Sequence, residues 1–361
     1  MIELEFGSFD HEKKLEEQRA LFIECFPETR DLAVSSTDHY YWKFHSKLGE
    51  RGSVEYSVCE EGEMIGYYAA IPYNYQYGDS ILHAAMVCDV MTGVKARGKG
   101  VFTRLGKYAT SKMAEVGFDV TTGYPIRPEV IPGHLKAGWK IALDLPMYGR
   151  IIRFDALLKS KKIGLLAPLA NGIYTFFSTL ISLPFRVAQK DFCVRVFSSR
   201  ELSQIENIDA FYAGWQKNIP IALIKDRAFL EWRLNAPQKE YQILVLYHQN
   251  QIAGILVATE FTHSGIPCLG VLDLTLSEGY FQKSTILLQE AVRVAKQRNC
   301  ELVLMMMSPY WYSRYALLKS LFIRTPYKFY LIVKNLSNKV ANEVFFKVSN
   351  WHLTWIDSDD L

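Results

Sequence analysis

The sequence predicts an α/β fold made of two tandem domains, each a mixed β-sheet flanked by helices. Three observations predict it: a length of 361 residues, a repeat that relates the two halves of the chain, and a strand–helix–strand pattern in each half. A single core rarely grows beyond about 250–300 residues, so two packed units are expected. A strand that enters a helix and returns as a parallel strand, beside hairpin strands, makes each sheet mixed.

The repeat extends over about a hundred residues of each half. Matching segments share a Trp followed by a basic residue, an apolar strand, a second apolar strand, and a strand with a central aspartate. In the first half these are residues 41–44, 56–59, 63–70 and 87–90, and in the second half 231–234, 243–246, 251–258 and 271–274. An amphipathic helix (101–116; 281–298) and an apolar strand (118–122; 302–307) follow in each half. Matching order and spacing over this length predict two copies of one fold.

The predicted boundaries place a first domain at residues 1–155, an apolar linker helix at 156–190 and a second domain at 191–361. Within the linker, residues 163–185 carry no charge, which is long enough to span a bilayer. Pro168 and Pro184 argue against a span, which would also separate the two halves. We expect an interdomain helix that buries its apolar face against protein; the alternative is an interfacial helix in contact with lipid, flanked by basic residues. The flanking basic residues are Lys159, Lys161, Lys162, Arg186 and Lys190.

Composition excludes several function classes. The net charge of +3 and the pI of 8.3 are too small an excess to predict a nucleic-acid partner. The six cysteines are scattered without a C-x-x-C pair, and the histidines show no ligand spacing, so no metal is expected. Buried, reduced thiols and an acidic start without a signal-peptide pattern predict a cytoplasmic protein, with membrane association through 163–185 as the alternative.

The sharpest motif lies between the aspartate strand and the amphipathic helix of the first half. Gly98 and Gly100 stand between a strand that ends near Thr92 and a helix that starts near Val101. Glycines allow a tight turn whose backbone N–H groups, aimed along a helix N-terminus, form an anion site. The motif fits neither the P-loop pattern nor the dinucleotide G-x-G-x-x-G pattern. A glycine-rich turn that only caps the helix is the alternative.

This motif resembles the signature Gln/Arg-x-x-Gly-x-Gly/Ala of the GNAT acetyltransferase superfamily, in which a bacterial branch carries tandem domains. Arg97, Gly98, Lys99, Gly100 and Val101 match it, whereas Phe102 stands where Gly or Ala is usual. The resemblance implies two GNAT-like domains and acetyl-CoA as co-substrate. It also implies that the backbone of Met91 and Thr92 pairs with the pantetheine, and that residues 97–102 bind the pyrophosphate.

The corresponding loop of the second half, residues 277–283, has one glycine and an added carboxylate, Glu278. A carboxylate repels a diphosphate, so the second domain is predicted not to bind CoA and to shape the acceptor pocket or hold the fold.

Three residues are candidates for proton transfer, because acyl transfer to an amine needs a base for the ammonium proton and an acid for the departing thiolate. The resemblance implies a tyrosine four residues before Gly138, and His134 stands there instead; a histidine titrates near neutrality and could take that role. The alternative for His134 is a surface helix position. Tyr124, directly after a strand, is a second candidate acid, and Glu129 could reach an acceptor. Asp89 has a counterpart, Asp273, in the half without the loop, which favours a structural role such as hydrogen bonding to buried backbone.

Together these observations predict an N-acetyltransferase that moves an acetyl group from acetyl-CoA to a primary amine by direct attack. The small-molecule acceptor could be an amino sugar, an amino acid or a peptide-like compound. Two alternatives remain: a module that binds acyl-CoA without turnover, and a tandem-GNAT transferase of aminoacyl or long acyl groups, although the latter often lack the 97–100 type of loop. The oligomeric state stays open.

Overall fold

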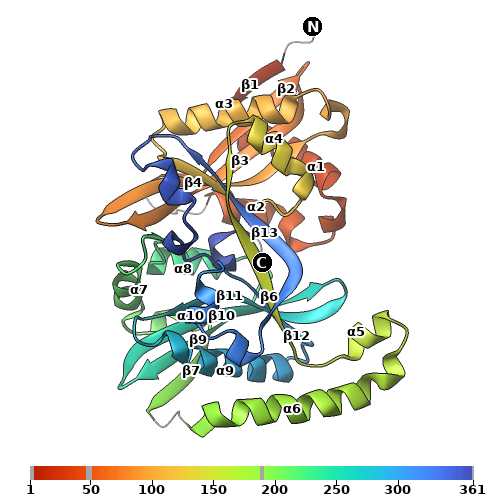
Figure 1. Ribbon diagram of the computed structural model, residues 1–361. Helices are drawn as coiled ribbons and strands as arrows, with labels where there is room; N and C mark the ends of the chain where they lie inside the picture. The colour runs from red at the N-terminus through yellow and green to blue at the C-terminus, as the bar shows by residue number, and fades with distance from the viewer. Residues whose placement is uncertain (1–3, 46–50, 188–190, 360–361) are drawn as a thin grey trace.

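The computed structural model describes residues 4–45, 51–187 and 191–359, of which 179–187 are described by their backbone alone. The two halves have the same order of elements, apart from one short strand, β8, and one short helix after β13, α11 (Asn342–Phe345), which are extra in the second (Figure 1). The first half contains β1 (Leu4–Ser8), α1 (His11–Cys25), α2 (Thr37–His45), β2 (Val54–Glu60), β3 (Glu63–Tyr77), β4 (Ser80–Thr92), α3 (Val101–Glu115), β5 (Val120–Gly123), α4 (Ile131–Lys136) and β6 (Lys140–Ile151). The second contains β7 (Phe192–Ser198), α7 (Ile208–Gln216), β8 (Ile221–Leu223), α8 (Arg227–Arg233), β9 (Tyr241–His248), β10 (Gln251–His263), β11 (Ile266–Leu276), α9 (Ser284–Gln297), β12 (Leu302–Met306), α10 (Trp311–Arg314) and β13 (Ile323–Asn335). This confirms the predicted fold class, and adds the first strand of each half, which the sequence reading missed.

A single mixed sheet of 13 strands runs through the described residues, in the order β1-β2-β3-β4-β5-β13-β6-β12-β11-β10-β9-β7, with β8 paired to β3. The last strand, β13, lies between β5 and β6 and is antiparallel to both. In turn β6 pairs with β12 of the second half. Each half therefore completes the sheet of the other, so the two halves share one continuous sheet. The residue boundaries proposed for the two domains stay a prediction.

The repeat places equivalent residues against each other. The rings of Trp42 and Trp232 stack with centroids 5.2 Å apart and planes 11° apart. Trp42 Nε1 donates to the carbonyl of Trp232 at 2.8 Å, and Trp232 Nε1 donates to the carbonyl of Trp42 at 2.9 Å. Such reciprocal contacts are what a two-fold axis produces, so the halves are related by a pseudo-two-fold axis that passes between these tryptophans.

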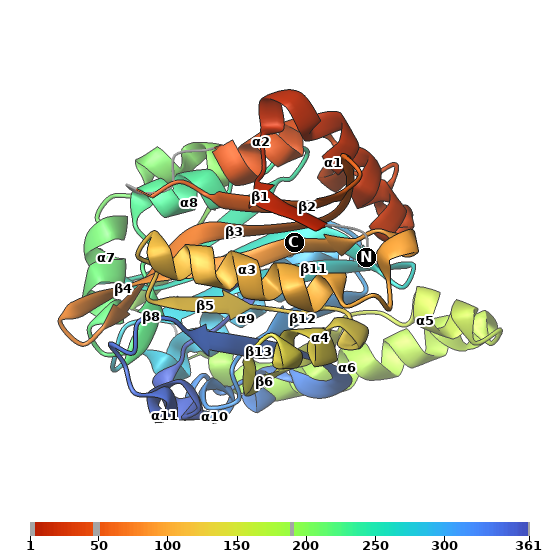
Figure 2. The same cartoon turned by 90° about the horizontal axis from the view of Figure 1, so that it is seen from above.

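Helices cover both faces of the first half of the sheet (Figure 2). α3 packs on one face through buried side chains spaced four apart, Val101, Leu105, Ala109 and Met113. That spacing places them on one side of a helix with 3.6 residues per turn. α1 and α2 lie on the opposite face, where Leu21, Phe22, Tyr40 and Phe44 join the larger core. The helix predicted at 101–116 is thus confirmed to within one residue.

Two expectations about the linker and the cysteines are wrong. The linker contains α5 (Asp155–Ser160) and α6 (Ala167–Val187), and α6 exposes the apolar face that was expected to pack on protein. The predicted contacts of the side chains at 180, 181, 186 and 190 lie outside the described residues. No helix in the described part of the chain is long and apolar enough to cross a membrane. Five cysteines are buried as expected, but Cys193 is exposed, because it points outward from the edge strand β7.

Candidate active site

The site begins where two parallel strands stop pairing. β4 and β5 pair over four residues only, Ala84–Val87 of β4 with Val120–Gly123 of β5. A β-bulge follows in β4, where Asp89 and Val90 together oppose one residue of β3, and Asp89 has a φ of 46°. Bulges bend a strand and end local pairing. β4 then continues along β3 as far as Thr92, while the chain leaves β5 after Gly123, so an opening forms between the two strands.

Two cavities meet at this opening. The loop cavity, of about 880 Å³, is lined by residues of the 96–103 segment and of the 126–136 segment. The inner cavity, of about 450 Å³, contains the side chains of Lys43, Asp89 and Asp359 on its wall. The cavities share five lining residues, so they are adjacent. The shared residues are Phe26, Val90, Ile126, Arg127 and Val130.

The loop cavity has the geometry of an anion site. Gly98 and Gly100 have φ values of 76° and 75°, and open space lies where a side chain of either would project. Gly100 caps α3, and the first backbone hydrogen bond of this helix runs from Arg104 N to Gly100 O at 3.1 Å. The amides of residues 101–103 precede that bond and are left for an anion at the positive end of the helix. These amides can therefore donate hydrogen bonds to an anion; that residues 97–102 bind a pyrophosphate stays a prediction.

Met91 and Thr92, the predicted backbone partners of the pantetheine, point their backbone N–H and C=O groups in opposite directions. Gly93 N donates to Ile65 O of β3 at 2.9 Å, and strand alternation turns Met91 toward β3 as well. The Thr92 carbonyl points away from β3, since it accepts from Arg97 Nε at 3.3 Å. By the same alternation, Val90 shares the open edge with Thr92. The sequence reading named Met91 and missed Val90, because the bulge that sets this phase has no local sequence signal.

His134 is buried in α4 and lines the inner cavity. Its ring contacts Phe102 and Trp139 edge-on, with centroids 5.0 and 5.3 Å away. Burial lowers the pKa of His134 from 6.5 to about 4, so the ring is neutral near pH 7 and is a weak base. The alternative of a surface histidine is wrong. Phe102, the departure from the signature, is the residue that closes over His134.

Tyr124 and Glu129 occupy different depths. Tyr124 lies at the end of β5 on the wall of the inner cavity, with its hydroxyl 3.5 Å from that of Tyr75. Burial raises the pKa of Tyr124 well above its ordinary value, which keeps it protonated. Glu129 is exposed at the mouth of the loop cavity. Arg127 beside it is held by an ion pair with Glu28 and by a hydrogen bond to Cys25 O at 3.0 Å.

The inner cavity holds an ion cluster that the sequence reading missed. Buried Lys43 of α2 lies 2.8 Å from Asp89 and 2.7 Å from Asp359. Although burial disfavours its charge, the two carboxylates hold the pKa of Lys43 well above the ordinary value. Cys88 groups with both carboxylates in the spacing of metal ligands, and the ammonium of Lys43 offsets the charge of one of the two carboxylates. Asp89 thus bonds a side chain, whereas a bond to buried backbone was expected.

A lysine among the apolar residues of α2 and an aspartate near the chain end are both visible in the sequence. However, they lie 316 residues apart, and no sequence pattern pairs them.

Comparison with known proteins relates the first half of the chain to one family. Residues 11–142 match the family model of an acetyltransferase (GNAT) domain. This stretch contains the opening, the loop and α4. Over this stretch the chain is similar to the GNAT acetyltransferases. No curated protein matches the sequence.

Solved structures share the fold over nearly the whole chain. A GCN5-related N-acetyltransferase from Anabaena variabilis is 13% identical, with a TM-score of 0.62 over 92% of this chain and 73% of that one. One from Kribbella flavida is 13% identical, with a TM-score of 0.59 over 93% and 72%. Saccharomyces cerevisiae N-myristoyltransferase with bound myristoyl-CoA is 12% identical, with a TM-score of 0.59 over 92% and 79%. At these identities the likeness shows the fold.

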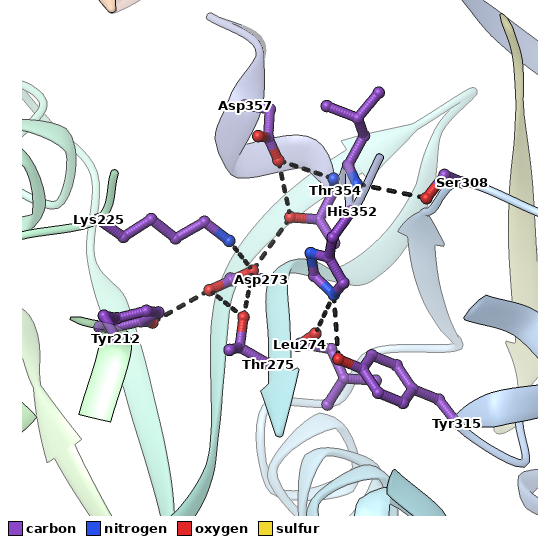
Figure 3. A network of polar contacts seen from close by, with 11 residues as sticks. Tyr212, Lys225, Asp273, Leu274, Thr275, Ser308, Tyr315, His352, Thr354 and Asp357 are labelled. Atoms are coloured by element: carbon purple, nitrogen blue, oxygen red, sulfur yellow. Dashed lines mark hydrogen bonds and ion pairs between the residues drawn. The ribbon is translucent and has the colours of Figure 1, made fainter. Parts of the chain in front are cut away.

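The second half lacks the opening that the GNAT domain has. β11 and β12 also pair over only four residues, Cys268–Val271 with Leu302–Met305. Beyond that point the C-terminal segment fills the gap (Figure 3). His352 Nε2 lies 3.1 Å from Leu274 O of β11, and Ser308 N, two residues after β12, donates to Leu353 O at 3.0 Å. This segment therefore contacts β11 and the chain that continues from β12.

Side chains anchor the filling segment. Thr354 Oγ1 donates to Asp273 Oδ1 at 3.1 Å, and Lys225 Nζ reaches the same oxygen at 2.7 Å (Figure 3). Tyr212 donates to Asp273 Oδ2 at 3.0 Å. Asp273 thus differs from its counterpart Asp89: it is fully buried and holds the chain end, whereas Asp89 faces a cavity.

The loop of the second half is likewise filled. Gln282 Nε2 donates to Arg314 O at 2.8 Å, and the Phe281 ring packs between Trp311 and Tyr315. The prediction that the second half binds no CoA rests on the single glycine and on the carboxylate of Glu278 in this loop; the filled gap adds a steric argument for it.

Proposed function

We propose that the protein is an acyl-CoA-dependent N-acyltransferase that transfers acetyl from acetyl-CoA to a primary amine. One observation carries the proposal: the opening between β4 and β5 lies beside both an anion-binding loop and an inner cavity that contains carboxylates. The match to the GNAT domain supports acyl-CoA as the donor.

The inner cavity has the groups that amine chemistry needs. Asp89 and Asp359 present carboxylate oxygens that attract and hold an ammonium group. Although burial opposes ionisation, Lys43 holds the pKa of Asp359 below its ordinary value. Tyr124 stays protonated and can donate a proton to a leaving thiolate. A bound acyl-CoA would supply the activated thioester; the protein supplies position, charge and proton transfer.

His134 fits a different role from the one predicted. A neutral ring between Phe102 and Trp139 shapes the cavity wall and positions Phe102 at the loop. We therefore assign binding of the acceptor's ammonium group to Asp359 and proton donation to Tyr124, and treat His134 as a positioning residue.

One observation favours a longer acyl chain as a second candidate. The part of the inner cavity nearest α1 is lined by apolar side chains: Phe22, Phe26, Leu32 and Val34. An acyl chain longer than acetyl would bury its methylene groups there. The structural likeness to an N-myristoyltransferase is compatible with this candidate.

The test is thiol release from acetyl-, octanoyl- and myristoyl-CoA by the purified protein, with an amino sugar, an amino acid or a dipeptide as acceptor. Amine-dependent release that is fastest with acetyl-CoA supports the proposal, and fastest release with a longer donor selects the second candidate. The variant Asp359→Asn should lose most of this rate, while Asp144→Asn, at an exposed ion pair with Lys328, should keep it. Binding of CoA esters without release under any acceptor would replace the transferase with a binding module.

A further inference from the structure

Helix α6 contacts the rest of the protein through its polar side. Tyr174 donates to Ile151 O at 2.6 Å, and Asn171 accepts from Phe154 N at 2.8 Å. Ala167 and Ser178 are buried on the same side. At 3.6 residues per turn, positions 167, 171, 174 and 178 form one stripe. Small and polar side chains therefore make the contact that apolar side chains usually make.

The opposite side of α6 is apolar and exposed. Six large apolar side chains, four on the helix and two in the turn before it, are each more than half exposed and form one face. They are Leu165, Leu166, Leu169, Ile173, Phe176 and Phe177. Soluble surfaces rarely gather so many exposed large apolar side chains in one patch. The figures place α6 at the edge of the molecule, with α5 beside its first turns (Figures 1 and 2).

Charge is concentrated in the same segment. Residues 151–187 contain five basic residues and one acidic residue, a net charge of +4, whereas the remainder of the chain carries −1 because the whole chain carries +3. Lys159, Lys161 and Lys162 are exposed in the turn that leads to the apolar face. An apolar helical face flanked by exposed lysines complements a surface that is apolar inside and anionic at its boundary.

We propose that α6 docks the protein on the surface of an anionic lipid bilayer. The helix lies in the plane of the membrane, with Phe176 and Phe177 among the acyl chains and the lysines of the preceding turn at the headgroups. This inference does not depend on the proposed acyltransferase function, since none of residues 167–178, the part of α6 whose side chains are described, lines either cavity.

The test is co-sedimentation of the purified full-length protein with vesicles of phosphatidylcholine alone and of phosphatidylcholine mixed with phosphatidylglycerol. We expect binding to the anionic vesicles that weakens with added salt. The double variant Phe176→Ser/Phe177→Ser should bind about tenfold less or weaker still, because two deep apolar contacts are lost. The triple variant Lys159→Gln/Lys161→Gln/Lys162→Gln should lose the preference for anionic vesicles.

A matched control tests whether the loss of any two exposed apolar side chains, rather than of those on α6, reduces vesicle binding. Leu318→Ser/Ile323→Ser removes two apolar side chains that are similarly exposed elsewhere, and it should bind as the wild type does. All these positions are exposed, so the variants should keep the thermal midpoint of the wild type. Equal sedimentation of the wild type and the Phe variant would overturn the proposal. So would a wild-type dimer in light scattering that the Phe variant converts to a monomer, because a second copy of the chain would then cover the face.

Discussion

Replacing Lys225 by Met tests the account of the filled gap in the second half. Lys225 and Asp273 are both fully buried, 2.7 Å apart, and Asp273 also holds Thr354 of the C-terminal segment. Removing one partner of a buried pair leaves an uncompensated charge and costs about 3–5 kcal/mol. The exposed pair of Lys328 and Asp144 offers a matched comparison, for which the loss is about 0–1 kcal/mol.

The assay is urea unfolding of Lys225→Met and Lys328→Met, with tryptophan fluorescence as the readout of the unfolded fraction. The double variant Lys225→Met/Asp273→Asn should recover part of the loss, since no buried charge remains. pH adds a second signature. In the wild type, burial raises the pKa of Asp273 but Lys225 and its hydrogen bonds lower it further, so the net pKa is depressed and the carboxylate stabilises the fold less as pH falls.

In Lys225→Met the pKa of Asp273 should rise above its unfolded value, so the native state binds the extra proton. The difference from the wild type should then shrink on acidification. A loss for Lys225→Met no larger than that for Lys328→Met, at every pH, would refute the reasoning.

Three further predictions concern the interface between the halves and the active site. Trp42→Phe and Trp232→Phe each remove a donor of the reciprocal pair, so each should lower the free energy of unfolding by about 1–3 kcal/mol, and unequal losses in urea unfolding would contradict the pseudo-symmetry. The pKa of His134 is about 4 in the folded protein against 6.5 in the unfolded one, so the unfolded state binds the extra proton and the free energy of unfolding falls as the pH drops from 7 to 4. His134→Gln should remove roughly 3 kcal/mol of that fall. An unchanged dependence of the free energy of unfolding on pH would contradict the burial of His134. Lys43→Met leaves Asp89 and Asp359 side by side on a cavity wall without their counter-ion. We expect at least a tenfold loss of kcat/KM for the amine and a near-normal Kd for acetyl-CoA. Equal losses in kcat/KM for the amine and in affinity for acetyl-CoA would place Lys43 outside the acceptor site.

Local patterns in the sequence predicted the parts of the fold that local interactions determine. The repeat, the helix at α3 and the glycine turn before it follow from apolar spacing and from the backbone freedom of Gly98 and Gly100. Those features also located the anion site, because a helix N-terminus and its loop are contiguous in the chain.

Non-local pairing explains what the sequence did not show. The insertion of β13 beside β5 and the route of the C-terminal segment from His352 to Asp359 depend on contacts between distant residues. The apolar periodicity of α6 was visible, but the side that docks on the protein is decided by Asn171 and Tyr174, whose backbone partners lie beyond the helix. Apolar periodicity alone does not distinguish a face that packs on protein from one that is left exposed.

The most direct test of the central claim is a calorimetric titration with acetyl-CoA of the wild type, Gly100→Asp and Gly279→Asp. Both glycines have positive φ, 75° and 88°, and Asp tolerates this conformation better than most residues, so the two variants carry a similar backbone cost. Only the first places a carboxylate in the proposed phosphate cradle. We predict one site per chain in the wild type and in Gly279→Asp, and loss of that site in Gly100→Asp. Undiminished binding by Gly100→Asp, or no binding by the wild type, would contradict the account.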